Sequence, residues 1–342
     1  MNTPLSRLIL ATTLVGIFVF APAAPIQAAQ TRVLKISHQF TGGTIDEGDF
    51  RDRLARKFAQ EVERRTGGEL KFEIYPGGSL VKTMSQFGAL SKGALDMTVL
   101  PLAYAGGMVP EVNLTLMPAL VTSYEQGLRW KSAPIGKELD RVLDAKGVKI
   151  VTWIWQAGGI ASNGKPAIVP DDIKGMKVRG GSKEMDQMLK AAGAAITSLP
   201  SNEIYSAMQS KVLDAAVTSS TSLISFRLYE HSKSVTTARK RSFWFMFEPL
   251  LISKAAFDSL TPVQQKIVME VGASLEGFGM EAAKFDDQEL ARVYEKAGVK
   301  VYDLDEAAFR QWKKIAQESA WKDFEQTVPN GRQLMEMATS VK

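Results

Sequence analysis

Apolar residues along the first hundred positions follow two periods in turn. Short stretches with an apolar residue at every second position alternate with longer stretches in which apolar residues recur every four, as at Phe50, Leu54 and Phe58. The first pattern is typical of a half-buried strand and the second of an amphipathic helix. This alternation predicts an α/β domain with a largely parallel sheet. The expected elements are strands over 33–37, 70–74 and 97–100 and helices over 50–62 and 83–91.

A second α/β unit is expected after position 148, because strand and helix patterns alternate there again with different residues. Val148–Trp155 predicts a strong strand that ends at Gly158-Gly159, and Ser201 can cap a helix that runs through Lys211. The other expected elements are strands over 176–178 and 213–217 and a helix over 183–192.

The segment that begins at Thr261 predicts one long helix. Thr261 can be its N-cap, Pro262 occupies the first helical position, and Gln264 completes a capping box. Apolar positions continue to Val293, so the helix would reach about 50 Å at 1.5 Å per residue. That length exceeds the diameter of one domain, and we expect the helix to bridge two lobes. The places where it can bend are Gly272, Gly277 and Gly279.

The N-terminus is typical of a secretory signal peptide. Arg7 precedes the apolar run Leu8–Phe20, and the small residues of Ala21–Ala29 follow. The run is shorter than the about 20 residues of a membrane-spanning helix, which argues against a retained anchor. We expect cleavage near Ala28 or Ala29, and a soluble, exported, periplasmic protein. A lipid anchor is excluded because no cysteine lies near that site.

Composition narrows the function classes. The 342 residues are 45% hydrophobic and 23% charged, which is typical of a globular protein with a normal core. Cysteine is absent, so disulfides, thiolate metal sites and cysteine nucleophiles are excluded. The net charge of +5 is spread among acidic residues rather than gathered in blocks, which argues against nucleic-acid binding.

Catalytic and cofactor motifs are not found. The two histidines, His38 and His231, lie far apart in sequence, and no HExxH, GxSxG or GxGxxG motif occurs. Gly159–Lys165 fits the first seven positions of a phosphate-binding loop, but Pro166 stands where Ser or Thr would hold magnesium, so we interpret the match as chance. We therefore predict no cofactor and no metal site. Features interpreted as structural are the acidic pairs Asp171-Asp172 and Asp286-Asp287, at helix caps and solvated faces, and the aromatic cluster Phe243–Phe247, in the core or a hinge.

Arg179 is the strongest candidate for binding chemistry. It directly follows the strand over 176–178, and ligands of open α/β sheets bind beyond the carboxyl ends of strands. Its planar guanidinium suits bidentate pairing with a carboxylate. Gly180 and Gly181 would let a ligand approach the backbone closely. On these grounds alone, a surface or ion-pairing role for Arg179 remains an alternative.

Motifs along the mature chain resemble those of the extracytoplasmic solute receptors of tripartite ATP-independent periplasmic (TRAP) transporters, of the C4-dicarboxylate-receptor type. Each motif is weak by itself, but their order and spacing are specific. They are Leu34-Lys-Ile-Ser-His38, Phe58–Gly68, Ile74–Gly78, Gly93–Met97, Pro110-Glu111, Asp172–Arg179, Glu203–Gln209 and Asp214.

The resemblance implies a two-lobed periplasmic binding protein fold, class II-like, whose lobes close on the ligand around a hinge. Each lobe would be a sheet flanked by helices, with a long helix spanning both. The lobe boundaries we predict are 30–155 with 242–285 for lobe I and 156–241 with 286–342 for lobe II, after a signal peptide over 1–29. The resemblance also implies that Arg179 binds the ligand carboxylate and that the closed receptor docks on the membrane permease subunits of an ion-driven transporter.

Two departures from the family pattern shape the expected ligand. Many members carry a second Arg near Gly158, and many follow the Asp of the second motif with Gly and then Glu-Asn-Pro, where this chain has Ala215–Thr221. One cation fewer favours a monocarboxylate with an apolar or aromatic body, for which Trp155 rather than Trp153 is expected to face the cleft. The predicted ligand-binding residues are Arg179, Trp155, Thr218, Ser219, Ser220, Trp244, Phe243, Tyr104 and His38.

Other functions remain open at this level. A receptor for C4-dicarboxylates or sugar acids would share the same fold. A secreted hydrolase or lyase would need two converging carboxylates, and the sequence indicates no such pair. A receptor for an ATP-driven importer or a signalling sensor is a further alternative.

Overall fold

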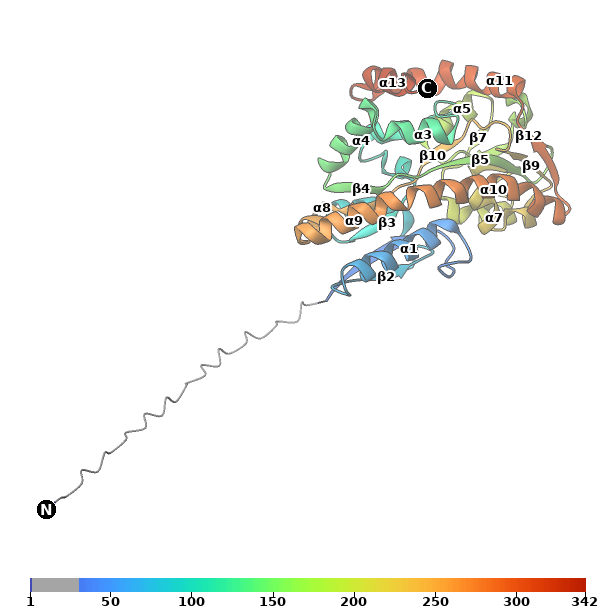
Figure 1. The fold of residues 1–342 in the computed structure, drawn as a ribbon. Coiled ribbons are helices and arrows are strands. Elements are labelled where there is room, and N and C mark those ends of the chain that lie inside the picture. Colours follow the sequence, from blue (N-terminus) through green and yellow to red (C-terminus); the bar gives the residue numbers. More distant parts are fainter. Residues whose placement is uncertain (2–30) are drawn as a thin grey trace. The chain divides into compact units, whose positions relative to one another are not determined.

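Two β-sheets organise the chain in the computed structural model, which describes Met1 and residues 31–342 (Figure 1). The predicted signal peptide lies outside the described residues. No helix in the described part of the chain is long and apolar enough to span a membrane. Mixed sheets flanked by helices confirm the α/β class predicted from the alternating patterns.

The first sheet has five strands in the order β2-β1-β3-β11-β4. β1 pairs in parallel with β2 and β3, as the strand–helix–strand pattern predicts, while β11 runs antiparallel between β3 and β4. The strands are β1 (Arg32–His38), β2 (Leu70–Tyr75), β3 (Met97–Val99), β4 (Val148–Thr152) and β11 (Leu250–Ser253).

The second sheet has the order β12-β9-β5-β8-β6-β7, with β10 paired to β5. The central strand β5 is antiparallel to β8, β9 and β10, and the pairs β6–β7, β6–β8 and β9–β12 are parallel. The strands are β5 (Trp155–Ser162), β6 (Lys177–Arg179), β7 (Ala195–Ile196), β8 (Ala215–Ser219), β9 (Ser234–Thr237), β10 (Phe245–Phe247) and β12 (Lys300–Asp303).

Helices cover both sheets. In the first, α1 packs on β2 and α4 on β4; in the second, α10 packs on β5 and α5 on β7. The helices are α1 (Phe50–Arg65), α2 (Gln86–Ser91), α3 (Tyr124–Trp130), α4 (Pro134–Asp144), α5 (Lys183–Ala191), α6 (Ile204–Gln209), α7 (Ser220–Ser225), α8 (Lys254–Asp258), α9 (Pro262–Ser274), α10 (Glu276–Lys296), α11 (Glu306–Ala316), α12 (Lys322–Thr327) and α13 (Gly331–Thr339).

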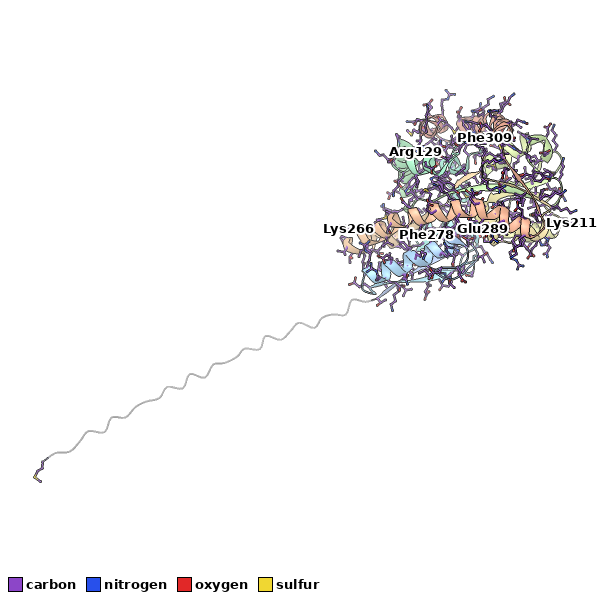
Figure 2. The ribbon with its side chains drawn as sticks, turned by 45° about the vertical axis from the view of Figure 1, so that its right-hand side comes forward. Arg129, Lys211, Lys266, Phe278, Glu289 and Phe309 are labelled. Carbon is purple, nitrogen blue, oxygen red and sulfur yellow. The ribbon has the colours of Figure 1, made fainter. Side chains whose placement is uncertain are left out.

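The predicted long helix is present as α9 and α10, which follow each other across both sheets in Figure 1. Thr261 and Gln264 form the expected capping box. α9 packs on β4 of the first sheet and α10 on β5, β9 and β12 of the second. The two helices are separated at Leu275, just after Gly272, where a Cβ would come within 2.3 Å of the Val151 carbonyl oxygen. On its other side α10 presents Phe278, labelled in Figure 2, to two cations of α1.

Two local predictions were wrong. The segment over 148–162 forms two strands, β4 and β5, and Gly158 and Gly159 lie inside β5 instead of ending it. Glycine is required there because a Cβ at Gly159 would lie 2.2 Å from the Thr236 carbonyl oxygen of the neighbouring strand. Ser201 begins a 3₁₀ turn and makes no side-chain cap, and the helix after it ends at Gln209.

The segment Phe243–Phe247 joins the cores of the two sheets. Phe245 and Phe247 belong to the core of the first sheet, whereas Phe243, Trp244 and Met246 belong to a core of the second. The lobe boundaries stay a prediction. The C-terminal helix α13 packs against α4 and against the 3₁₀ helix η3 (Pro110–Leu116).

Candidate functional site

Arg179 ends β6 with its side chain fully buried. Its Nε donates to the Leu199 carbonyl oxygen at 3.0 Å, Nη1 to the Val217 carbonyl oxygen at 2.9 Å, and Nη2 to the Tyr104 hydroxyl at 2.7 Å. All three acceptors are neutral. A guanidinium has five N–H donors, so one N–H remains on each terminal nitrogen. The side chain is therefore a fixed, buried cation with donors left for a further acceptor. Arg179 itself is not among the residues that line the cavity described below, whereas Tyr104 is.

Gly181 lies directly against this guanidinium. Its φ is +100°, and a Cβ at this position would be 2.7 Å from Nη1 of Arg179. A side chain here would both strain the backbone and push the guanidinium. The close neighbour of Gly181 is thus the Arg179 side chain, and the close approach of a ligand to this backbone stays a prediction.

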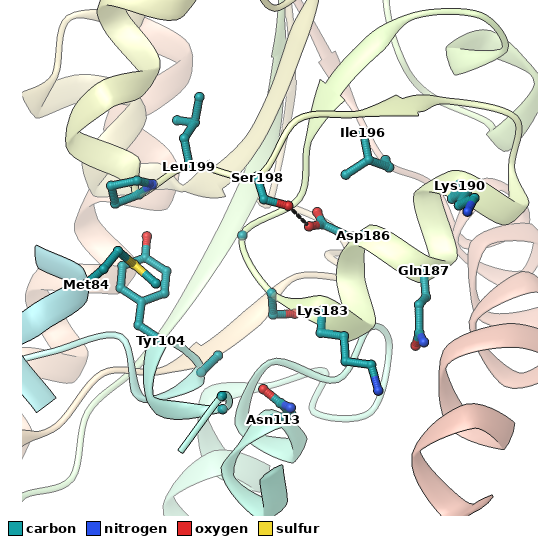
Figure 3. Close-up of a pocket in the computed structure, with 16 residues that line it drawn as sticks. Met84, Tyr104, Asn113, Lys183, Asp186, Gln187, Lys190, Ile196, Ser198 and Leu199 are labelled. Atoms are coloured by element: carbon teal, nitrogen blue, oxygen red, sulfur yellow. Dashed lines mark hydrogen bonds between the residues drawn. The ribbon is translucent and has the colours of Figure 1, made fainter. Parts of the chain in front are cut away.

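A cavity of about 600 Å³ lies beside the Tyr104 ring and Gly181 (Figure 3). Its size is within the range of small-molecule sites. It lies between the segment that follows β3, helix α5 and the segment that follows β7. The mainly apolar side of the lining comprises Met84, Ala103, Tyr104, Gly106, Gly107, Gly181, Ile196, Leu199 and Pro200. The polar lining residues are Asn113, Ser182, Lys183, Asp186, Gln187, Lys190 and Ser198.

Asp186 is held in the cavity wall by two hydrogen bonds. It accepts from the Gly180 backbone N–H at 3.1 Å and from the Ser198 hydroxyl at 2.7 Å, the latter drawn in Figure 3. Burial raises the pKa of Asp186, and the hydrogen bond from Ser198 and the nearby charge of Arg179 oppose that shift. Both carboxylate oxygens are thus engaged by the protein.

The three hydroxyl-bearing residues predicted to bind ligand, Thr218, Ser219 and Ser220, lie outside the cavity lining, and two of them bind charged side chains. Ser219 caps α7 and accepts a hydrogen bond from Nη1 of Arg51, and Ser220 donates to Asp287. Thr218 is buried opposite Gly159 in the β5–β8 ladder. None of the three lines the cavity. To contact a ligand, Ser219 and Ser220 would have to release Arg51 and Asp287. The binding role of the three residues therefore stays a prediction.

The predicted aromatic wall is part of the two cores. Trp155 packs edge-on against Trp130 with ring centroids 5.1 Å apart, and against Phe247 at 5.2 Å. Phe243 packs on Trp312 at 4.7 Å. The Trp244 indole N–H points to the Gly180 carbonyl oxygen at 3.4 Å. In this structure none of Trp155, Phe243 and Trp244 lines the cavity, because large rings are also the side chains that best fill a core.

His38 is likewise held inside the first sheet. Its Nε2 lies 3.1 Å from Oδ1 of Asp52, and its ring stacks on Phe40. Asp52 also accepts from Arg56 at 2.7 Å. His38 is fully buried and outside the cavity lining, so its predicted contact with ligand also stays a prediction.

Gly158, near which many members of the resembled family carry an Arg, lies in a crowded place. A Cβ at this position would come within 2.3 Å of the Thr218 carbonyl oxygen and 2.6 Å of the Trp244 ring. No side chain fits there while β5 pairs with β8. An arginine at this position is therefore excluded as long as the pairing is kept.

Sequence reasoning missed several buried polar groups. Gln39, next after β1, and Gln156, in β5, are each 1% exposed, and no amide atom of either has a hydrogen-bond partner among the described residues. Asp287, expected on a solvated face, is 6% exposed and accepts from the Tyr124 hydroxyl at 2.6 Å. Burial raises the pKa of Asp287 to about 6. The position of Gln39 at the carboxyl end of a strand was the available signal.

Comparisons with known proteins agree across nearly the whole chain. A family model described as bacterial extracellular solute-binding protein, family 7, matches residues 42–327. A solute-binding protein of Albidiferax ferrireducens is 62% identical over 296 residues, which are 86% of this chain and 88% of that protein. The 2,3-diketo-L-gulonate-binding periplasmic protein of Escherichia coli is 26% identical over 326 residues, 93% of this chain and 96% of that protein.

A solved structure gives the same fold. The crystal structure of a TRAP periplasmic solute-binding protein from Rhodoferax ferrireducens with bound malonate aligns with a TM-score of 0.89 at 59% identity. The alignment covers 90% of this chain and 98% of that chain.

Proposed function

The chain belongs to family 7 of the bacterial extracellular solute-binding proteins, and from this premise we propose how it holds its ligand. Membership confirms the resemblance to TRAP solute receptors and the two-lobed fold. The protein captures a small carboxylate for a TRAP transporter. In the proposed mechanism Arg179 pairs with one carboxylate of the ligand, and the apolar part of the ligand lies against Tyr104 and Leu199.

One observation carries this proposal. Arg179 is fully buried, its hydrogen-bond partners are neutral, and the Tyr104 and Gly181 that contact it line the cavity. A buried cation is costly unless a counter-charge pairs with it. An incoming carboxylate supplies that charge and meets the two N–H groups left on the terminal nitrogens.

The ligand class follows from the lining. Tyr104, Leu199 and Ile196 contribute apolar surface to the lining, which supports a monocarboxylate with an apolar or aromatic body. No second arginine fits at Gly158, so a further cation for the ligand would have to come from Lys183 or Lys190 of the lining. A C4-dicarboxylate or sugar-acid ligand is the second candidate, and the malonate bound to the Rhodoferax protein favours it.

Capture ends in delivery in the proposed cycle. The lobes close on the ligand, and the closed protein docks on the membrane permease subunits, which an ion gradient drives. The site of action is the periplasm. No catalysis is proposed: Asp186 is the one acid among the described residues that line the cavity, whereas a hydrolase or lyase would need a converging pair.

Calorimetry on Arg179→Ala tests the proposal. Malonate, 2,3-diketo-L-gulonate and phenylacetate are titrated into the parent protein and the variant. The variant should fold and lose about 2–5 kcal/mol of binding free energy for whichever acid the parent binds, the range for breaking a buried charged pair. Unchanged affinity would sink the assignment of Arg179. A preference for phenylacetate supports the apolar monocarboxylate, and a preference for malonate the dicarboxylate.

A further inference from the structure

Arg51 joins elements of the two sheets at a place away from the cavity. It lies in the first turn of α1, which covers the first sheet, and it is 1% exposed. Its Nη1 donates to the Ser219 hydroxyl at 3.3 Å and its Nη2 to the Ser222 hydroxyl at 3.1 Å. Both serines belong to the end of β8 and the start of α7, in the second sheet.

A third hydrogen bond runs the opposite way. The Ser225 hydroxyl of α7 donates to Oδ2 of Asp49, the N-cap of α1, at 2.8 Å. One face of α7 is thus bound to the N-terminal turn of α1 by a guanidinium and a carboxylate. None of the residues that make these bonds lines the cavity.

The charged groups of this contact are Arg51 and the two carboxylates that bind it, Asp49 and Glu248. Asp49 accepts from Nε of Arg51 at 2.8 Å and from Nη2 at 2.6 Å, and Glu248 accepts from Nη1 at 3.2 Å. The guanidinium carbon lies 3.7 Å from the centre of the Phe40 ring. A guanidinium held in this way is pre-organised, so hydrogen bonds to serines of the other side require little further ordering.

The serine side supplies only neutral groups. Separating α1 from α7 would therefore leave the Arg51–Asp49 pair intact and expose hydroxyl groups that water can solvate. No buried charge loses its counter-charge in that step. Such a contact can form and break repeatedly, which is what a reversible closure requires.

We propose that Arg51 and Asp49 form a clasp with Ser219, Ser222 and Ser225 that holds the two lobes in the closed arrangement. Arg51 is thus a positioning residue for ligand capture that acts through α7 and touches no ligand. The inference rests on the closure described under the proposed function. The apparent affinity of a receptor depends on the fraction of molecules in the closed state that binds ligand. Weakening the clasp lowers that fraction, so it weakens binding without altering the cavity.

Distance measurements on a double variant test the clasp. Ser222→Ala/Ser225→Ala removes two of its hydrogen bonds and keeps the Arg51–Asp49 pair. Thr221→Val is the matched control. Thr221 lies on the same helix, but its hydroxyl donates to Asp286 on α10 and makes no hydrogen bond to α1. Spin labels are attached at Lys71→Cys, on β2, and Val212→Cys, before β8; both positions are exposed and the chain has no cysteine of its own.

Pulsed electron–electron distance measurements are made without ligand and with malonate as the probe. In at least one condition the double variant should show a smaller short-distance population than the parent and the control. For any malonate binding that the parent shows, the dissociation constant should rise about tenfold in the double variant. Circular dichroism melts establish that all variants fold.

Identical distance distributions in both conditions for the parent, control and double variant would overturn the clasp. Failure of the proposed ligand class is seen separately, as a parent protein whose distances and melting temperature do not respond to malonate or to the other acids. A ligand-free difference between the double variant and the control would still support the clasp in that case.

Discussion

Arg179 and Arg51 are both fully buried, yet the protein surrounds them in opposite ways. Arg179 donates to two backbone carbonyl oxygens and one tyrosine hydroxyl. Arg51 is bound by two carboxylates, Asp49 and Glu248, and by serine hydroxyls. One cation is positioned but left without a counter-charge in its hydrogen bonds; the other is neutralised within the fold.

The contrast shows how a buried charge can be assigned a role from its partners. Burial raises the pKa of Glu248 to about 7 despite Arg51, while the charge and hydrogen bonds of Arg51 outweigh burial and hold the pKa of Asp49 below its usual value. Arg51 therefore belongs to a closed electrostatic unit. Arg179 has no carboxylate among its hydrogen-bond partners, and the proposed function assigns that place to a carboxylate of the ligand.

The largest expected effect comes from removing each cation in turn. Arg51→Met leaves Asp49 beside Glu248 in a buried site, and we expect it to lower the free energy of unfolding by about 3–5 kcal/mol. Arg179→Met strands only neutral acceptors and should cost about 1–3 kcal/mol. Urea denaturation of both variants at pH 8 measures the difference. Equal losses would mean that the two sites are electrostatically alike.

Glu184 on α5 is a buried acidic residue that, like Arg179, has no oppositely charged hydrogen-bond partner among the described residues. It is buried, neither carboxylate oxygen has a partner among the described residues, and burial raises its pKa from 4.5 to about 7. Because the folded pKa exceeds the unfolded one, stability falls as pH rises from about 4.5 to 7 and then levels off. The loss amounts to about 3 kcal/mol.

Glu184→Gln should remove this contribution. The difference in unfolding free energy between variant and parent is measured from pH 4 to 8. It should change in favour of the variant by about 3 kcal/mol over that range. A pH-independent difference would show that the pKa of Glu184 is the same in the folded and the unfolded protein, so that burial does not disfavour its charged form. The pKa values of Glu248, Asp286 and Asp287 are raised as well. Because the parent and the variant both contain these groups, their contributions cancel in the difference.

Gly181→Ala tests whether the position of the Arg179 guanidinium matters for ligand binding. The added Cβ would lie 2.7 Å from Nη1 and displace the guanidinium. We expect carboxylate affinity to fall roughly tenfold, or about 1.4 kcal/mol. Gly164→Ala is the control, since no atom lies within 4 Å of its Cβ position. Calorimetry that finds the two variants equal would separate Arg179 from the binding event.

Tyr104→Phe should have the smallest effect. The hydroxyl accepts from Arg179 and from the Ser201 backbone N–H at 3.0 Å, so its loss frees one guanidinium donor and unpairs one amide. We expect a loss of about 1 kcal/mol in ligand binding, measured by calorimetry. A larger loss would place the hydroxyl itself among the ligand's partners.

Much of the architecture could be predicted because period and caps are local signals. The capping box at Thr261 and the helix over 183–192 depend on neighbours in sequence, and the structure has both. The break between β4 and β5 and the glycines within β5 depend on strands that pair from far away, so no local signal reveals them. The position of Arg179 at a strand end was local; its carbonyl partners were not.

Side-chain roles that depend on tertiary neighbours were less accessible. Ser219 and Ser220 were expected beside ligand because hydroxyls suit hydrogen bonding, but that same property lets Arg51 and Asp287 bind them. Trp155 was expected on a cleft wall because it lies near a loop, and in this structure its ring covers Gly127, where a Cβ would lie 2.6 Å from the ring. Its contact with ligand stays a prediction. A residue type states what a side chain can do, and the fold decides which partner it meets.

The crowding at Gly158 limits which substitutions can change the ligand specificity of this protein. A mutation to arginine there meets both a backbone oxygen and the Trp244 ring, so it is deleterious before it can confer a new preference. Shrinking Trp244 first removes only one of the two obstacles. A passage to a two-cation receptor therefore needs coordinated changes that reset the β5–β8 pairing. At Gly158, this chain can therefore gain a second arginine only through changes at several positions together.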